Sequence, residues 1–173
     1  MTSGTPVRSH LQASLGAPPP PSPSPSPSPP PPLSPNLRPL AVTDAVALAA
    51  PMWDAYRGTP DEADVGDLAG AVREIRLTLN GEYGTFLPTA SFVAEHEGRP
   101  VAGALVTLYK GVPLLAFLFV AKSHTGHGLG RTLIQAVMHA LAAQGHDTVT
   151  LAVTRRNHRA RRLYESLGFV EIA

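Results

Sequence analysis

The sequence predicts an α/β domain in which two antiparallel hairpins come first and alternating strands and helices follow. Three runs rich in apolar residues, at 91–96, 100–109 and 113–121, are separated by the short glycine-containing connections EGR and KGV. Apolar residues then recur at helical spacing from residue 129 to residue 141. The strand pattern DTVTLAV and a second helical pattern complete the chain. This change of pattern after residue 121 predicts strand, helix, strand and helix in that order.

The first elements of the expected domain are a short strand at 36–40 and two helices. Thr43 can cap a helix over 43–56, because its hydroxyl can accept a hydrogen bond from a free N–H group of the first turn. A second helix is expected over 64–80, where apolar residues recur at spacings of three and four. The apolar positions of these helices are Val46, Leu48, Ala49, Met52, Trp53, Val65, Leu68, Val72, Ile75 and Leu79.

The run PLLAFLFVA at 113–121 is apolar on both faces, as expected for a central strand covered on each side. It leads directly into the glycine-rich stretch HTGHGLG at 124–130, and the helix that starts there ends near Gly145. Main-chain N–H groups in such a loop, together with the helix dipole, favour an anion such as phosphate. The stretch therefore predicts an anion-binding loop, and a tight turn without a ligand is the alternative.

Several classes of site are excluded by the sequence. A P-loop needs Lys and then Ser or Thr after its second glycine, and the dinucleotide fingerprint needs a glycine where Arg131 stands. The chain has no cysteine, which excludes disulfides, thiolate metal ligands and cysteine nucleophiles. The histidines show no spacing typical of a metal site, so no metal is expected.

Residues 1–35 are expected to form a disordered tail, and residues 36–173 a single domain. The segment 18–35 is almost entirely proline and serine, which favours an extended, solvated chain. Such a segment serves as a spacer or as a ligand for a proline-recognising domain. The chain start lacks the apolar core of a secretory signal, and the longest apolar run is about half of a membrane span. We therefore expect a soluble cytoplasmic protein without a membrane partner.

Charge is unevenly distributed along the expected domain. Residues 36–97 contain ten acidic residues against four arginines, a net charge of −6, whereas residues 98–173 contain three acidic residues against nine lysines and arginines, a net charge of +6. The acidic half favours a cationic ligand and the basic half an anionic one. Five arginines near the C-terminus indicate a solvated helix face, with one or two near a ligand's phosphates as the alternative; they are Arg155, Arg156, Arg159, Arg161 and Arg162. Nucleic-acid binding is not expected, because no recognised module or interleaved aromatic residues accompany them.

Two motifs in the basic half resemble those of the GNAT superfamily of N-acetyltransferases, and the resemblance covers roughly residues 36–173. The family's glycine loop has the form Q/R-x-x-G-x-G/A, whose defined positions are occupied here by Thr125, Gly128 and Gly130. Its later motif, N-x-x-A-x-x-L-Y-x-x-x-G-F, is matched at every defined position by Asn157, Ala160, Leu163, Tyr164, Gly168 and Phe169. The two motifs occur in the family's order, with a strand pattern between them, so their combination is specific.

The resemblance implies a central mixed β-sheet flanked by helices, with acetyl-CoA in a cleft between two splayed parallel strands. The main chain of Leu118, Phe119 and Val120 would pair with the pantetheine arm, and an N–H group at Phe119 or Val120 would stabilise the oxyanion. Asn157 would hydrogen-bond the cofactor. Tyr164 would act as general acid toward the departing thiolate, and a core aromatic with an exposed hydroxyl is its alternative role. The loop residues expected at the cofactor's pyrophosphate are Thr125, Gly126, His127, Gly128, Leu129, Gly130 and Arg131.

We therefore expect an acetyl-CoA-dependent N-acetyltransferase that acts on an amine of a small molecule or a protein. The acidic half favours a cationic amine. The alternative is a non-catalytic CoA-binding or scaffold protein of the same fold. The candidates for a general base are Glu82, Glu95 and His96, and water can relay a proton instead.

Two departures from the family's pattern carry expectations of their own. Thr125 stands where the family has Gln or Arg, so phosphate binding is expected to be weakened but retained, because main-chain N–H groups provide most of it. Only four residues follow Phe169, so the family's last strand is expected to be absent. The open sheet edge that results would be a surface for a homodimer.

Overall fold

The two hairpins expected from the sequence form the centre of the sheet. The computed structural model describes residues 7–16 and 36–172. In it, three consecutive strands pair antiparallel: β4 (Phe92–His96), β5 (Arg99–Tyr109) and β6 (Val112–Val120). The short strand expected at 36–40 is also present, as β2 (Asn36–Pro39), and pairs with β4.

The described residues contribute eight strands to one sheet, in the order β2-β4-β5-β6-β7-β1-β8, with β3 paired to β5 beside this path. β6 and β7 are parallel, whereas the other pairs are antiparallel. The expected mixed sheet is therefore confirmed. The remaining strands are β1 (Arg8–Ser14), β3 (Thr85–Phe86), β7 (Thr148–Thr154) and β8 (Val170–Ile172).

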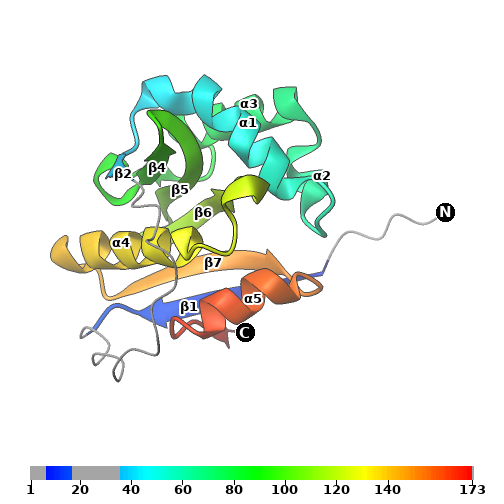
Figure 1. Ribbon diagram of the computed structural model, residues 1–173. Helices are drawn as coiled ribbons and strands as arrows, with labels where there is room; N and C mark the ends of the chain where they lie inside the picture. The colour runs from blue at the N-terminus through cyan, green and yellow to red at the C-terminus, as the bar shows by residue number, and fades with distance from the viewer. Residues whose placement is uncertain (1–6, 17–35, 173) are drawn as a thin grey trace, which may run out of the picture.

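Helices cover both faces of this sheet (Figure 1). One face carries α1 (Ala45–Tyr56), α2 (Glu62–Val65) and α3 (Leu68–Leu79), whose buried residues pack with Leu105 and Phe119 of the sheet. The other face carries α4 (Leu129–Ala143) and α5 (His158–Glu165), which share a core with Leu151 of β7. No helix among residues 7–16 and 36–172 is long and apolar enough to cross a membrane.

The helix expected over 64–80 is in fact two helices. Gly66 has a φ of 77°, which ends α2 because a left-handed backbone cannot continue an α-helix. Asp67 then caps α3 by accepting a hydrogen bond from the N–H of Gly70 at 2.6 Å. Leu68 at the start of α3 is therefore half exposed rather than buried.

The start of α1 also differs from the expectation. Thr43 does not cap it; a single turn of 3₁₀ helix (Val42–Asp44) precedes the α-helix, and the carboxylate of Asp44 accepts a hydrogen bond from the N–H of Ala41 at 2.8 Å. Val46, expected on the buried face, is 63% exposed. Leu48, Ala49 and Met52 are buried as expected, and Ala45 and Pro51 are buried with them.

Part of the expected N-terminal tail is a strand of the sheet. β1 lies between β7 and β8 and pairs with both. Its inward-facing residues Leu11 and Ala13, together with Leu15 just beyond it, belong to the main core. The expectation that residues 1–35 form a tail is therefore wrong for residues 8–14, because alternating apolar residues there can bury one face. Residues 1–6 and 17–35 lie outside the described part of the chain.

The expectation of an open sheet edge beside β7 is wrong, because β1 covers that edge. β1 occupies that position along all seven residues of β7, from Arg8 opposite Thr154 to Ser14 opposite Thr148. A segment from the start of the chain therefore provides the pairing expected to be missing at its end. The argument for a homodimer based on that edge no longer holds.

Candidate active site

A cleft opens in the sheet where its two parallel strands separate. β6 and β7 pair only through Leu114 with Thr150 and Leu115 with Leu151. The register of β6 against β5 shifts at the next residue, Ala116, after which β6 and β7 continue without pairing to each other. A cavity of about 730 Å³ occupies this place. The expected cleft between splayed parallel strands is thus present.

The free edge of β6 points main-chain donors into the cavity. Ala121 donates its N–H to the carbonyl of Val101 in the β5 chain at 2.8 Å. Because paired and unpaired residues alternate along an antiparallel ladder, the N–H groups of Leu118 and Val120 point away from β5, toward the cavity. Of the two expected oxyanion donors, Val120 therefore has the suitable direction, whereas the N–H of Phe119 faces β5.

The glycine loop forms the end of the cavity at the start of α4. Gly126 and Gly128 have φ values of 84° and 79°, and a Cβ added at either would meet no atom within 4 Å. Gly128 is the N-cap residue of α4 and offers no side chain to cap it. The first-turn N–H groups are therefore left for an external acceptor. This open cradle fits the diphosphate of coenzyme A.

The third glycine of the loop has a different role. A Cβ on Gly130 would lie 3.2 Å from Cδ2 of Leu163, so a larger residue would require the Leu163 side chain of α5 to shift. The two sequence motifs thus meet physically at this contact. The loop is also tied to the end of α1, where the N–H of Lys122 donates to Asp54 at 2.7 Å and the Lys122 ammonium donates to the carbonyl of Arg57 at 2.6 Å.

All but one of the expected cofactor-binding residues line the cavity. The exception is His127, which is exposed, with Nδ1 3.4 Å from the carbonyl oxygen of His124. The hydroxyl of Thr125 donates to the carbonyl of Lys122 at 2.9 Å and so stabilises its own turn. The residues that line it are Leu118, Phe119, Val120, Thr125, Gly126, Gly128, Leu129, Gly130, Arg131 and Asn157.

Tyr164, the expected general acid, also lines the cavity and is only 8% exposed. It lies on α5 and packs against Phe169, with ring centroids 5.7 Å apart. Burial, with a smaller contribution from the charge of Asp61, raises the pKa of Tyr164 above its usual value. Its hydroxyl is therefore neutral at pH 7, as that of an unperturbed tyrosine also is, and can act as a hydrogen-bond donor.

Asn157 begins α5 and uses both ends of its side-chain amide. Its oxygen accepts a hydrogen bond from the N–H of Ala160 at 3.1 Å, which caps the helix. Its nitrogen donates to Asp61 at 2.5 Å. The amide thus links α5 to the acidic half of the chain at the cavity wall.

A further set of cavity residues carries no motif and was missed by the sequence reasoning. They are Arg8, Tyr56, Asp61, Asp64, Glu74, Tyr83 and Phe117. Glu74 is 8% exposed and accepts a hydrogen bond from the hydroxyl of Tyr83 at 2.5 Å. Burial and this carboxylate raise the pKa of Tyr83 to about 12. The acidic balance of residues 36–97 was a sequence signal for the three carboxylates of this set, and the other members had none.

The three candidates for a general base lie elsewhere. Glu82 is exposed, and Glu95 forms an ion pair with Arg38 at 2.7 Å. His96 has its Nδ1 3.2 Å from Nε2 of His124. None of the three lines the cavity, whose carboxylates are Asp61, Asp64 and Glu74.

The five arginines near the C-terminus do not share one role. Arg161 of α5 and Arg155 of the turn before it form ion pairs with Glu171 of β8, at 3.1 and 3.3 Å. Arg159 lines the cavity, and Arg156 and Arg162 are exposed. Across residues 7–16 and 36–172, no three side chains gather as a metal site would require.

Comparison with known proteins agrees with this geometry. The model of the acetyltransferase (GNAT) family matches residues 56–169. The chain belongs to this family. N-alpha-acetyltransferase 40 of Saccharomyces cerevisiae is 37% identical over 100 residues, which cover 52% of this chain and 33% of that protein. This GNAT chain thus spans about a third of that relative's length.

Solved structures share the fold of this GNAT chain at lower identity. A GCN5-related N-acetyltransferase from Sphaerobacter thermophilus matches with a TM-score of 0.69 and 20% identity, over 97% of this chain and 50% of that one. The PaiA N-acetyltransferase from Thermoplasma acidophilum, solved in complex with coenzyme A, matches with a TM-score of 0.60 and 15% identity, over 78% of this chain and 89% of that one.

Proposed function

We propose that this protein is an acetyl-CoA-dependent N-acetyltransferase that acts on an amine of a small molecule or a protein. The observation that carries the proposal is a single cavity that brings together the uncapped start of α4, the free edge of β6 and the side chain of Tyr164. Family membership and the coenzyme A complex of the T. acidophilum relative support it. We also propose a cytoplasmic location, in keeping with a chain that has no cysteine.

The donor would be held mainly by the main chain. The N–H groups at 126–131 would bind the diphosphate, and the edge of β6 at Leu118 and Val120 would pair with the amides of the pantetheine arm. Arg131 and Arg159, both in the cavity wall, would add charge-assisted hydrogen bonds to phosphate. Thr125 would contribute no positive charge, so we expect weaker binding than with Arg at that position.

Acetyl-CoA supplies a thioester, whose carbonyl carbon forms a bond to the amine nitrogen as its bond to sulfur breaks. The Val120 N–H stabilises the negative charge that develops on the carbonyl oxygen, an effect of about 3 kcal/mol for one donor. Tyr164 gives its proton to the thiolate sulfur. A cavity carboxylate, Asp61 or Glu74, or water bonded to it, accepts the proton that the amine loses.

Substitution of Tyr164 separates an enzyme from a protein that only binds coenzyme A. Tyr164→Phe should lower acetyl transfer by about 10²–10⁴-fold, the usual contribution of a positioned proton donor, while calorimetry shows an unchanged affinity for acetyl-CoA. Thiol release with a panel of amines measures the rate. Tyr109→Phe is the matched control, because Tyr109 is 46% exposed and lies outside the cavity wall. Acetyl-CoA binding without turnover in the wild-type protein would support the scaffold alternative.

Substitution in the glycine loop tests the donor site. Gly128→Glu places a negative side chain in the anion cradle and should abolish measurable acetyl-CoA binding in calorimetry with the full chain. Gly145→Glu is the matched control: Gly145 has a similar φ of 82°, and a Cβ there also meets no atom within 4 Å. Equal losses in both variants would point to backbone strain and not to a lost anion site.

A further inference from the structure

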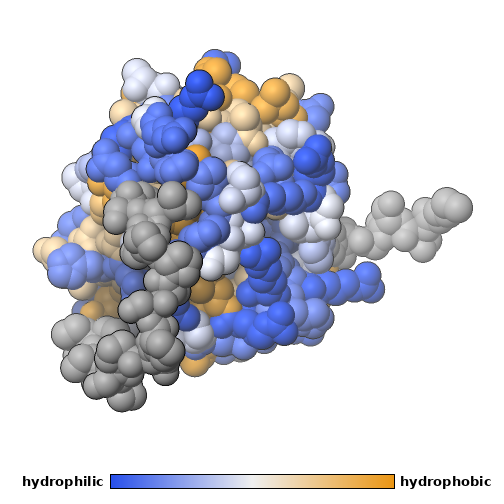
Figure 2. All heavy atoms as spheres, viewed as in Figure 1, coloured by the Kyte–Doolittle hydropathy of each residue, from blue (hydrophilic) through white to orange (hydrophobic). Residues whose placement is uncertain are grey.

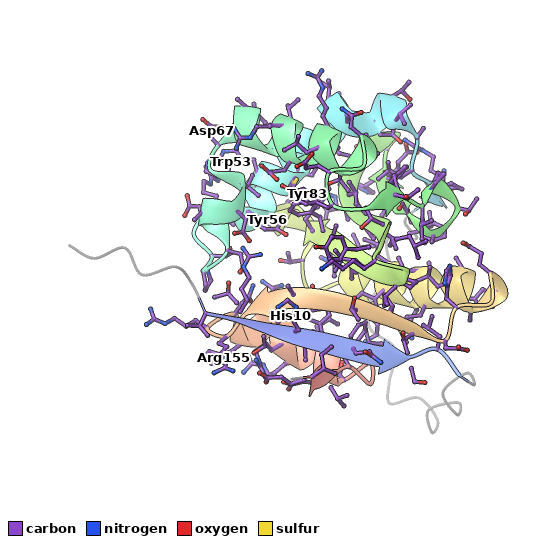
Figure 3. All side chains as sticks on the ribbon, turned by 180° about the vertical axis from the view of Figure 1, so that it is seen from behind. His10, Trp53, Tyr56, Asp67, Tyr83 and Arg155 are labelled. Carbon is purple, nitrogen blue, oxygen red and sulfur yellow. The ribbon has the colours of Figure 1, made fainter. Side chains whose placement is uncertain are left out.

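The cavity extends beyond the donor-binding residues into a second region, which we call the acceptor region. It is lined by Tyr56, Asp61, Asp64, Glu74, Tyr83 and Phe117. Figure 3 shows Tyr56 and Tyr83 near each other on the side of the molecule that carries α1 and α3. Their rings meet Phe117 edge-on, with centroid distances of 6.3 and 6.1 Å. Aromatic rings of this kind attract organic cations as well as apolar groups.

Two of the three carboxylates in the acceptor region are bound by neutral donors. Asp61 accepts a hydrogen bond from the side-chain amide of Asn157, and Glu74 accepts one from the hydroxyl of Tyr83, both at 2.5 Å. The nearest cation to Glu74 is Arg73, at 3.4 Å, whose side chain is 63% exposed. Together with Arg8 at Asp64, this pair sets two arginines against three carboxylates, which leaves one more negative charge than positive. The acceptor region therefore keeps a negative potential.

The carboxylates of the acceptor region also act on two tyrosines. Burial raises the pKa of Tyr56 most, and Tyr164, Asp61 and Asp64 add smaller contributions in the same direction. Asp61 also contributes to the raised pKa of Tyr164. Only the carboxylate part of this effect favours a positive charge placed near these hydroxyls, because burial alone opposes a charge of either sign.

The chain places a cation of its own in this region. Arg8 begins β1, and its guanidinium donates a hydrogen bond to the carboxylate of Asp64. The Arg8 side chain is 40% exposed and that of Asp64 is 24% exposed, and ion pairs with a solvent-exposed partner contribute little to stability. The pair therefore marks a position that accepts a cation and can exchange one cation for another at little cost.

We propose that the acceptor is an amine with a second positive charge, which binds at Asp64 in competition with Arg8 while the reacting amine lies near Tyr164. This inference rests on the proposed acetyltransferase function and names the class of its acceptor. The reacting amine must lose its proton before it attacks, so it cannot use ionic binding throughout. The second charge does not react and supplies the binding energy. A free diamine and a protein amino group beside a basic side chain share this chemistry.

The test is calorimetry on the full chain, with and without coenzyme A, using probes that differ by one charge. We compare 1,5-diaminopentane with n-pentylamine, and an Ala-Lys dipeptide amide with Ala-Ala amide. If 1,5-diaminopentane binds more tightly than the dipeptide, the acceptor is a free diamine. If the Ala-Lys amide binds more tightly, the acceptor is a protein amino group beside a basic side chain. Asp64→Asn should weaken binding of the preferred dication about tenfold, the value of one charge-assisted hydrogen bond, and Arg8→Ala should strengthen it. Asp147→Asn, an exposed carboxylate outside the cavity wall, should change nothing.

Several results would overturn the proposal. One is equal affinity for each dication and its singly charged analogue in the wild-type protein. Another is a normal dication affinity in Asp64→Asn, with unfolding temperatures that show both proteins folded. Weaker dication binding in Arg8→Ala would also contradict competition. The titrations without coenzyme A separate this inference from the proposed function, because a cation site can persist in a protein that binds no donor.

Discussion

At the residue scale, an ion network at the entry to α1 shows how one side chain holds several elements together. The guanidinium of Arg38 donates to both carboxylate oxygens of Asp44, at 2.7 and 2.8 Å, and to Glu95 at 2.8 Å. These contacts join β2, β4 and the turn before α1. The hydrogen bond from Arg38 holds the pKa of Asp44 below its usual value, although burial acts in the opposite direction.

We expect Asp44→Asn to destabilise the protein in a pH-dependent way. A carboxyl group whose pKa is lowered by folding contributes stability above its unfolded pKa of about 3.9, and the contribution is lost as pH falls through the folded pKa. The substitution should therefore cost about 1–3 kcal/mol at pH 7 and clearly less at pH 3. Urea unfolding at both values measures it. Asp147→Asn serves as control, and an equal loss at the two pH values would rule out this linkage.

Residues of the site differ in how far the sequence could reveal them. Tyr164 and Gly128 were predicted because each belongs to a contiguous motif whose chemistry depends on local backbone. Asp61 and Glu74 were not, because the packing of α2 and α3 brings them to the cavity from positions with no common spacing. A carboxylate at the surface of a helix looks the same in sequence whether it faces solvent or a cleft.

At the element scale, β1 is the element that differs most from what the sequence predicts. Leu11 is fully buried in the core on the α4 face, and its strand pairs with β7 and β8 on its two sides. The alternation that buries Leu11 and Ala13 is visible in the sequence. Seven residues of alternating pattern do not show which position in a sheet a strand occupies. The proline-rich stretch that follows favours an extended, solvated chain, so the whole segment was predicted to be a tail.

Substitution of Leu11 tests whether the packing of β1 in the core stabilises the folded protein. Leu11→Ala should lower the free energy of unfolding by about 2–5 kcal/mol, the range for large-to-small changes in a packed core. His10→Ala is the control, because His10 is the exposed neighbour on the same strand. Denaturant unfolding of the full chain gives both values. If the two variants were equally stable, β1 would not be part of the cooperative core.

At the scale of the whole molecule, the uneven charge predicted from the sequence becomes two sides of one cavity. The acidic side is provided by Asp61, Asp64 and Glu74, and the basic side includes Lys122 and Arg159. In Figure 2 the surface over α2 and α5 is largely hydrophilic, in keeping with charged groups on both sides. The sequence could predict the asymmetry but not that the fold turns its two halves toward a common space.

Because the cavity has an acidic and a basic side, we expect salt to weaken the binding of both a cationic and an anionic ligand. Raising NaCl from about 50 to about 500 mM shortens the screening length to a few ångströms. Acetyl-CoA should then bind several-fold more weakly, because it is attracted by the basic side, and 1,5-diaminopentane should do the same at the acidic side. Calorimetry at both salt concentrations measures the two affinities, with n-pentylamine as a reference of lower charge. A cavity dominated by one sign of charge would respond differently, since screening would then relieve repulsion for one ligand and strengthen its binding.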